Sequence, residues 1–467
     1  MNSIANEIKL DQGALRALEG AFGGELVGPE NPAYDEHRKV WNGSIDRSPA
    51  LIARCAGVAD VISAVRFARD AGLEVAVRSG GHSFPGLSVC DGGIIVDLGA
   101  MKGIRVDPEA RTARAQAGVL WGELDRETQM FGLATTGGIV THTGVAGLTL
   151  GGGIGWLQRK HGLTIDQLLS VDLVTADGEF VKASETENPD LFWGLRGGGG
   201  NFGIVTEFEF RLHPVGPIVF AGPIFWPMER ATELLRFYRD WSAEAPDELM
   251  TIVIQRKAPP LPFVPAELHG QPVVSVACCY AGPVEEGEKV VRPLKAFAPP
   301  VLDLCESKPY IVHQAMFDPS FPHGRWYYMR ACDVATLTDE VIDIAVDHSL
   351  RIRSELTAFP IWQLGGAVAR VPEEDTAFNG RGAGHTFNIT ATTATVDGFD
   401  EEREWVRNFW SALEPHHTSV YVNFLMDEGE ERIRQAYGAA KYDRLQALKR
   451  KYDPDNFFRL NQNIPPK

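Results

Sequence analysis

The sequence of 467 residues has few cysteines, no long apolar run and a deficit of basic residues. Its six cysteines form no CxxC pair and no regular spacing, so neither a disulfide framework nor a zinc site is indicated. No run of about 18 apolar residues occurs, and residues 1–10 lack the basic and apolar regions of a signal peptide. We therefore expect a cytoplasmic protein with reduced thiols, no metal site and no membrane partner.

The charge balance points the same way. The chain carries 45 Lys and Arg against 62 Asp and Glu, which gives a net charge of −17. Because binding to phosphate backbones depends on clustered cations, we expect no nucleic-acid partner.

Glycine, in contrast, is concentrated in three blocks. Arg78–Gly86 contains the sequence Arg-Ser-Gly-Gly-His, residues 137–155 contain eight glycines within 19 residues, and the third block is Arg196–Gly203. Glycine destabilises a regular helix or strand by roughly 0.5–1 kcal/mol relative to alanine, so this density predicts close backbone approach to a flat or anionic ligand. Taken alone, Arg78–Gly86 is better explained as a glycine-rich turn carrying a solvated or hydrogen-bonded histidine, and the rest of the chain reverses that preference.

The third block formally satisfies GxGxxG through Gly198, Gly200 and Gly203. It follows a predicted helix at 188–195 and leads into a predicted strand at 204–212, whereas the dinucleotide fingerprint runs from strand to helix. We therefore reject a Rossmann interpretation.

Hydrophobic periodicity predicts two different halves. A strand at 50–55, a helix at 57–71 and a strand at 73–77 form a βαβ unit, whose following loop is where such units place ligands. Hairpins are predicted at 104–116 and 168–183. Beyond residues 214–217 the sequence predicts an antiparallel sheet covered by amphipathic helices. The expected helices are 229–241, 285–297, 338–352 and 401–413, and the expected strands are 250–255, 273–280 and 386–395.

Together, the glycine blocks, His82 and the amide-rich tail Tyr452–Pro465 resemble the berberine-bridge-enzyme-like branch of the vanillyl-alcohol-oxidase flavoproteins. The resemblance covers nearly the whole chain, is weaker between about 222 and 358, and is strongest to bacterial members. It implies an α+β fold of two domains. These are a PCMH-type FAD-binding domain with two α/β subdomains at 1–215 and a substrate domain at 216–418, followed by a segment at 419–467 that returns to the first domain.

The resemblance also assigns the cofactor site. It implies FAD attached covalently through His82, and attached there alone, because Val140 stands where many relatives have a second, cysteine tether. The implied cofactor-binding residues are His82, Arg78, Ser79, Gly80, Gly81, Ser83, Gly137, Val140, Thr143, Gly144, Gly147, Leu148, Gly152, Gly153, Gly155, Trp156, Gly203, Ile204, Val205, Tyr421, Asn423, Asn461 and Asn463.

Four residues are candidates for catalysis. Tyr421 is either a general base, if its pKa is lowered, or a hydrogen-bonding partner of the flavin edge. Where relatives carry a glutamate base, residues 359–366 offer Gln363 instead, and His385 and Asn388 are further polar candidates unless they only bond within their strands. His142 and Thr143 are expected beside the flavin, where Thr143 either faces oxygen or caps a turn.

Three functions remain open from the sequence. The first is an oxidase that removes a hydride from an alcohol or amine carbon of a small or medium-sized, secondary metabolite and passes the electrons to O2. The second is a flavin-dependent oxygenase of polyketide tailoring, and the third is a flavin-binding protein without turnover. The sequence does not determine the substrate or the oligomeric state.

Overall fold

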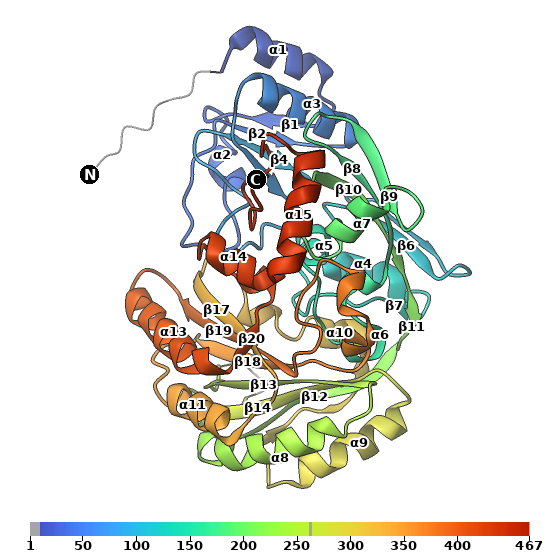
Figure 1. The fold of residues 1–467 in the computed structure, drawn as a ribbon. Helices are drawn as coiled ribbons and strands as arrows, with labels where there is room; N and C mark the ends of the chain where they lie inside the picture. Colours follow the sequence, from blue (N-terminus) through green and yellow to red (C-terminus); the bar gives the residue numbers. More distant parts are fainter. Residues whose placement is uncertain (1–9, 261–263, 467) are drawn as a thin grey trace.

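The computed structural model describes residues 10–260 and 264–466. Figure 1 shows two halves, with the two N-terminal sheets above and one large sheet with its helices below. The C-terminal helix α15 (Ala439–Tyr452) lies against the upper half. The predicted α+β class is confirmed.

The first sheet has four strands in the order β1-β2-β4-β3. The predicted βαβ unit is present as β2 (Leu51–Arg54), α3 (Val58–Asp70) and β3 (Val75–Arg78), and β4 (Ile94–Asp97) pairs parallel to both strands. The short strand β1 (Glu25–Val27) pairs antiparallel to β2, and α1 (Gln12–Ala21) contacts α3. Because β3 ends at Arg78, the first glycine block begins at the carboxyl end of this sheet.

The second sheet has five antiparallel strands in the order β5-β6-β10-β8-β9. Both predicted hairpins are found in it. Their strands, with the central strand, are β5 (Ile104–Asp107), β6 (Thr112–Gln116), β8 (Leu168–Val174), β9 (Phe180–Ser184) and β10 (Ile204–Arg211).

Three helices carry or flank the glycine blocks of this half. The second glycine block contains the short helix α5 (Val145–Leu150), and α4 (Trp121–Gln129) and α7 (Pro189–Leu195) flank the second and third blocks. As predicted, α7 ends where the third block begins.

The large sheet has nine antiparallel strands, in the order β15-β12-β14-β13-β18-β19-β17-β20, with β16 paired to β12. Its long strands are β12 (Ile218–Pro227), β13 (Leu249–Lys257), β14 (Pro272–Tyr280), β17 (Trp326–Val334), β18 (Ala358–Gln363) and β19 (His385–Thr393). The shorter edge strands are β15 (Leu302–Asp303), β16 (Glu306–Pro309) and β20 (His417–Ser419).

One face of the large sheet packs against the four predicted helices, and the other faces the upper half (Figure 1). These helices are α8 (Ala231–Ala243), α9 (Val284–Ala296), α11 (Asp339–Ser349) and α13 (Phe399–Leu413). The predicted boundary at residue 215 falls just before β12, while the one at 418 falls inside β20. The division into domains itself stays a prediction.

The C-terminal segment is anchored in the upper half by buried polar groups. Lys449 and Asp453 form a fully buried ion pair at 2.7 Å, and Asp453 also accepts the backbone N–H groups of Phe457 and Phe458. The Asn201 side chain bonds the carbonyl of Gln462 and the N–H of Ile464. A buried charge is tolerated only when it is paired and hydrogen-bonded, so these contacts fix where the tail docks.

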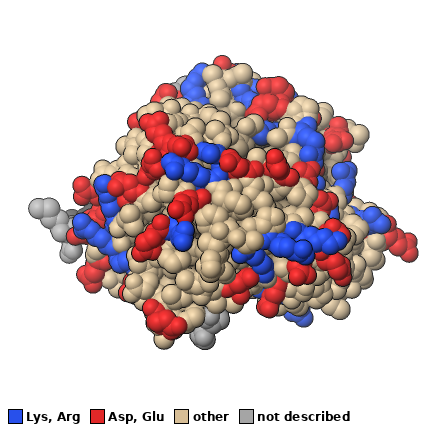
Figure 2. Space-filling model, turned by 90° about the horizontal axis from the view of Figure 1, so that it is seen from below, with Lys and Arg blue, Asp and Glu red and all other residues tan. Residues whose placement is uncertain are grey.

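Three observations bear on the remaining expectations. All six cysteines are free and buried, as predicted. None of the helices in the described part of the chain is both long and apolar enough to cross a membrane. Figure 2 shows cationic and anionic side chains interspersed on the face seen from below.

Candidate active site

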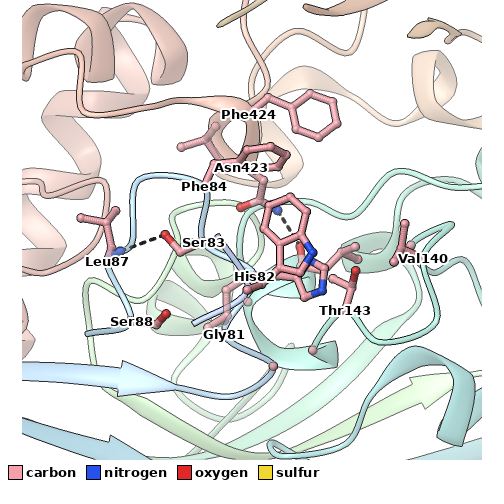
Figure 3. A pocket seen from close by; sticks show the side chains of 18 of the residues that line it. Gly81, His82, Ser83, Phe84, Leu87, Ser88, Val140, Thr143, Asn423 and Phe424 are labelled. Atoms are coloured by element: carbon pink, nitrogen blue, oxygen red, sulfur yellow. Dashed lines mark hydrogen bonds between the residues drawn. The ribbon is translucent and has the colours of Figure 1, made fainter. Parts of the chain in front are cut away.

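A cavity of about 380 Å³ lies between the glycine blocks and the large sheet. Figure 3 shows that its labelled residues come from the loop after β3, the loop before α5 and the segment after Tyr421. On the sheet side, the cavity is lined by residues that alternate along the strands. They are Ile252, Ile254 and Arg256 of β13, Ala358, Pro360 and Trp362 of β18, and Asn388 and Thr392 of β19. Because successive side chains of a strand point to opposite faces, this parity decides which residues reach the cavity.

Most predicted cofactor residues line this cavity. Those that do are Ser79, Gly80, Gly81, His82, Ser83, Val140, Thr143, Gly144, Gly147, Leu148, Gly203, Ile204, Val205, Tyr421, Asn423 and Asn461. The structure places the others outside its lining, namely Arg78, Gly137, Gly152, Gly153, Gly155, Trp156 and Asn463.

Two glycine blocks touch each other through their backbones. A Cβ atom on Gly80 would lie 2.4 Å from the backbone nitrogen of Gly144, and one on Gly144 would lie 2.5 Å from that of Gly80. Such distances exclude any side chain at either position. The contact holds the loop of His82 against the start of α5.

The reason for several other glycines differs from the one expected. A Cβ atom on Gly155 would lie 1.7 Å from the carbonyl oxygen of Gly137, and one on Gly137 would meet the Trp121 ring at 2.3 Å. Gly153, at a φ of +84°, is crowded by Thr164. These glycines are required by packing within the chain, and not by direct approach to a ligand.

Gly147 and Gly200, however, line the cavity and have nothing within 4 Å of a Cβ atom. Around the same space, Ser88 Oγ, the Tyr437 hydroxyl and Asn461 Oδ1 are buried without a hydrogen-bond partner among the described residues. Buried polar atoms are rarely left unpaired, so these atoms indicate a polar ligand. Glycine surfaces together with unpaired polar atoms fit the predicted FAD.

His82 lies in a cluster of three histidines at the cavity wall. Its Nε2 is 2.6 Å from Nδ1 of His142, and the ring of His323 is 5.0 Å from that of His142. Burial, followed by the neighbouring histidines, lowers the pKa of His82 well below its usual range, and burial also lowers the pKa values of His142 and His323. All three rings are therefore neutral at neutral pH.

The sequence analysis missed two parts of this arrangement. Trp41 stacks on His82 at 4.7 Å between ring centroids and on Tyr327 at 3.8 Å. His323 comes from the segment before β17, and no local pattern marks either residue. The ring nitrogens of the three histidines lie within 4.8 Å of one another, which is close enough for them to share a metal ion.

Arg78 does not offer its cation to the cavity. Its guanidinium donates to Asp97 at 2.9 Å and is buried beneath the first glycine block. The predicted role of Arg78 in binding the cofactor stays a prediction, and its guanidinium has a structural partner in Asp97.

Tyr421 reaches the second glycine block from the C-terminal segment. Its hydroxyl oxygen accepts hydrogen bonds from the Gly153 N–H at 2.9 Å and from Asn423 Nδ2 at 2.8 Å. Burial raises its pKa to about 12, although both bonds oppose the shift. The lowered pKa that a phenolic base needs is absent, so Tyr421 remains protonated at neutral pH.

The polar candidates on the sheet point to different faces of it, because side chains alternate along each strand. Gln363 points away from the cavity, where its Oε1 accepts from Thr251 at 2.7 Å and its Nε2 donates to the carbonyl of Ser242. His385 pairs with Gln363 across β18 and β19 and also lies outside the cavity lining. The expectation that both line the substrate side is contradicted by the structure, and Asn388 alone of the three lines the cavity.

His142 is not among the cavity-lining residues. It forms a hydrogen bond with His82, which does line the cavity. Its neighbour Thr141 donates from its N–H and its hydroxyl to Asp318. This contact ties the loop before α5 to the segment that carries His323.

Comparison with known proteins identifies two family models in the chain. A family model described as an FAD binding domain matches residues 49–184, and a model described as berberine and berberine like matches residues 420–465. An FAD-linked oxidoreductase of Dictyostelium discoideum is 33% identical over 92% of this chain and 91% of its own length.

A second relative links the sequence and structure comparisons. (R)-6-hydroxynicotine oxidase of Paenarthrobacter nicotinovorans is 31% identical over 95% of this chain and 97% of its own length. The crystal structure of 6-hydroxy-D-nicotine oxidase from Arthrobacter nicotinovorans superimposes with a TM-score of 0.86 at 30% identity, covering all of both chains. The chain therefore belongs to the berberine-bridge-enzyme-like family of FAD-linked oxidoreductases.

Proposed function

We propose that this FAD-linked oxidoreductase oxidises an alcohol or amine carbon of a small or medium-sized metabolite, with FAD attached through His82 and O2 as the electron acceptor. The observation that carries the proposal is the neutral His82, held 2.6 Å from His142 at the wall of the cavity. FAD supplies the redox step, because its N5 accepts a hydride and the reduced ring passes electrons to O2.

The chain prepares His82 for attachment by controlling its proton. In the pair His82 Nε2 and His142 Nδ1, one ring donates and the other accepts. When His82 donates, its other ring nitrogen keeps a free lone pair, which is the nucleophilic form. Trp41, stacked on the His82 ring, fixes its orientation. No cysteine is found among the described residues that line the cavity, which supports attachment through His82 alone.

Tyr421, which also lines the cavity, acts as a hydrogen-bonding group and not as a base. Because its oxygen already accepts two hydrogen bonds, its own proton is free to be donated. Thr143 and Leu148 also line the cavity, and in this proposal Thr143 faces oxygen.

Denatured protein tests the tether. We expect acid-precipitated wild-type protein to stay yellow, and His82→Ala protein to release all its flavin into the supernatant. His269→Ala, which changes a histidine bonded to the Val264 carbonyl, should leave the pellet yellow. A colourless wild-type pellet would show that the flavin is not covalent.

The fate of oxygen separates the oxidase from the alternative oxygenase. An oxidase produces one hydrogen peroxide per product, whereas an oxygenase transfers labelled oxygen from O2 into the product. A protein that holds flavin but is not reoxidised by air after chemical reduction would contradict both.

A further inference from the structure

Arg256 is the only charged side chain among the described residues that line the cavity. It lies near the end of β13 on the same face as Ile252 and Ile254. Strand alternation therefore places a guanidinium where the two preceding positions carry apolar side chains. The residue is partly exposed, and a charged side chain on an otherwise apolar cavity wall needs a functional explanation, because a charge favours water or a charged partner.

The protein leaves this cation without a counter-ion. Nε donates to the Lys257 carbonyl at 3.1 Å and Nη1 to Ser320 Oγ at 3.3 Å. Across residues 10–260 and 264–466, no hydrogen bond from Nη2 and no ion pair to a carboxylate is found. The charged group that affects its pKa is a second cation, Arg325. Burial, and then Arg325, lower the pKa of Arg256 to about 10, so it is still protonated at neutral pH.

The cavity wall that continues from Arg256 is apolar and aromatic. Arg256 pairs with Ala358, while Pro360 and Trp362 lie farther along the same face of β18, opposite Ile254 and Ile252. Phe317 and Phe321, which also line the cavity, flank Ser320 in the sequence. These side chains suit the flat or aliphatic body of a small molecule. A guanidinium fork at its edge matches the two oxygens of a carboxylate.

We propose that the substrate is an organic acid whose carboxylate pairs with Arg256 while its apolar body packs against β13, β18 and the segment 317–321. One guanidinium and one hydroxyl suit a carboxylate better than a doubly charged phosphate ester. The inference rests on the proposed function, because it names the substrate class of the same cavity.

Calorimetric titration of the purified holoprotein tests the proposal without turnover. The probes are benzoate and phenylacetate, compared with benzamide and phenylacetamide, which keep the shape and lose the charge. We expect the acids to bind at least about tenfold more tightly than the amides, and Arg256→Gln to weaken the acids about 10- to 100-fold without affecting the amides.

Lys257→Gln is the matched control. It removes the same charge from the next residue of β13, but the Lys257 ammonium points to the opposite face and bonds the Arg353 carbonyl. This variant should bind acids and amides like the wild type. Arg256→Lys keeps the charge without the fork and should lie between wild type and Arg256→Gln, which provides a test if Arg256→Gln does not fold.

Flavin content, measured on the same samples, separates the possible failures. Equal affinity for acids and amides, or no binding of either acid, in flavin-loaded protein would overturn this inference and leave the proposed function intact. Loss of flavin from Arg256→Gln would mean that Arg256 pairs with the cofactor phosphates, which also overturns it. A wild-type protein without flavin would instead remove the proposed function.

Discussion

The two walls of the cavity differ in whether backbone or side-chain atoms line them. The wall formed by the glycine blocks is largely backbone, and its loops meet at Gly80 and Gly144 without room for a side chain. The wall formed by β13, β18 and β19 is made of side chains and holds the one charged group of the cavity lining in the described chain, Arg256. A wall made of backbone suits one cofactor of fixed shape. A wall made of side chains can be altered by single amino-acid substitutions, so it can be adapted to different substrates.

The glycine wall offers the largest test of this comparison. Gly144→Ala places a methyl group 2.5 Å from the Gly80 backbone nitrogen, and we expect the free energy of unfolding to fall by about 3 kcal/mol. Gly147→Ala, three residues on in α5, meets nothing within 4 Å and should stay within about 1 kcal/mol of the wild type. Chemical denaturation measures both, and equal losses would contradict the distinction between backbone packing and ligand contact.

Buried histidines should make the protein sensitive to acid, and His313 is one of them. His313 is buried with both ring nitrogens unpaired, and burial lowers its pKa to about 3. Its contribution to stability is therefore complete above its unfolded pKa of about 6.5 and is lost as the pH falls toward 3. Between pH 7 and pH 5 we expect the free energy of unfolding to fall by about 2 kcal/mol through His313.

Urea titrations at the two pH values, on wild type and His313→Phe, measure this contribution. The variant should lose about 2 kcal/mol less than the wild type between pH 7 and pH 5. An unchanged pH dependence in His313→Phe would show that another group titrates.

Substitution of Tyr421, at the junction of the two walls, should have the smallest effect on stability. Tyr421→Phe leaves the Gly153 N–H and one Asn423 bond without an acceptor, and we expect a loss of about 1–2 kcal/mol in thermal unfolding. The hydroxyl of Tyr310 has no partner among the described residues and lies outside the cavity lining, so Tyr310→Phe should change stability by less than about 0.5 kcal/mol. A larger loss in Tyr310→Phe than in Tyr421→Phe would reverse the assignment.

Local patterns predicted the fold well and the site in part. Periodicity located the βαβ unit, both hairpins and the four helices on the large sheet, because each element obeys its own hydrophobic period. The glycine blocks located the cavity wall. The side chain of Gln363 was misplaced because the parity of β18 points it away from the cavity, and the ion pair of Arg78 with Asp97 was not predicted.

What the sequence determined by itself is therefore the class of elements, the position of His82 and the family resemblance, all of which depend on neighbouring residues or spaced motifs. Tertiary structure alone decided the rest. Trp41, His142 and His323 surround His82 from segments as far as 241 residues away from it. Arg256 is a candidate ligand contact only because no carboxylate in the described part of the chain pairs with it. Contacts of that kind depend on which distant strands and loops meet, and no local periodicity records them.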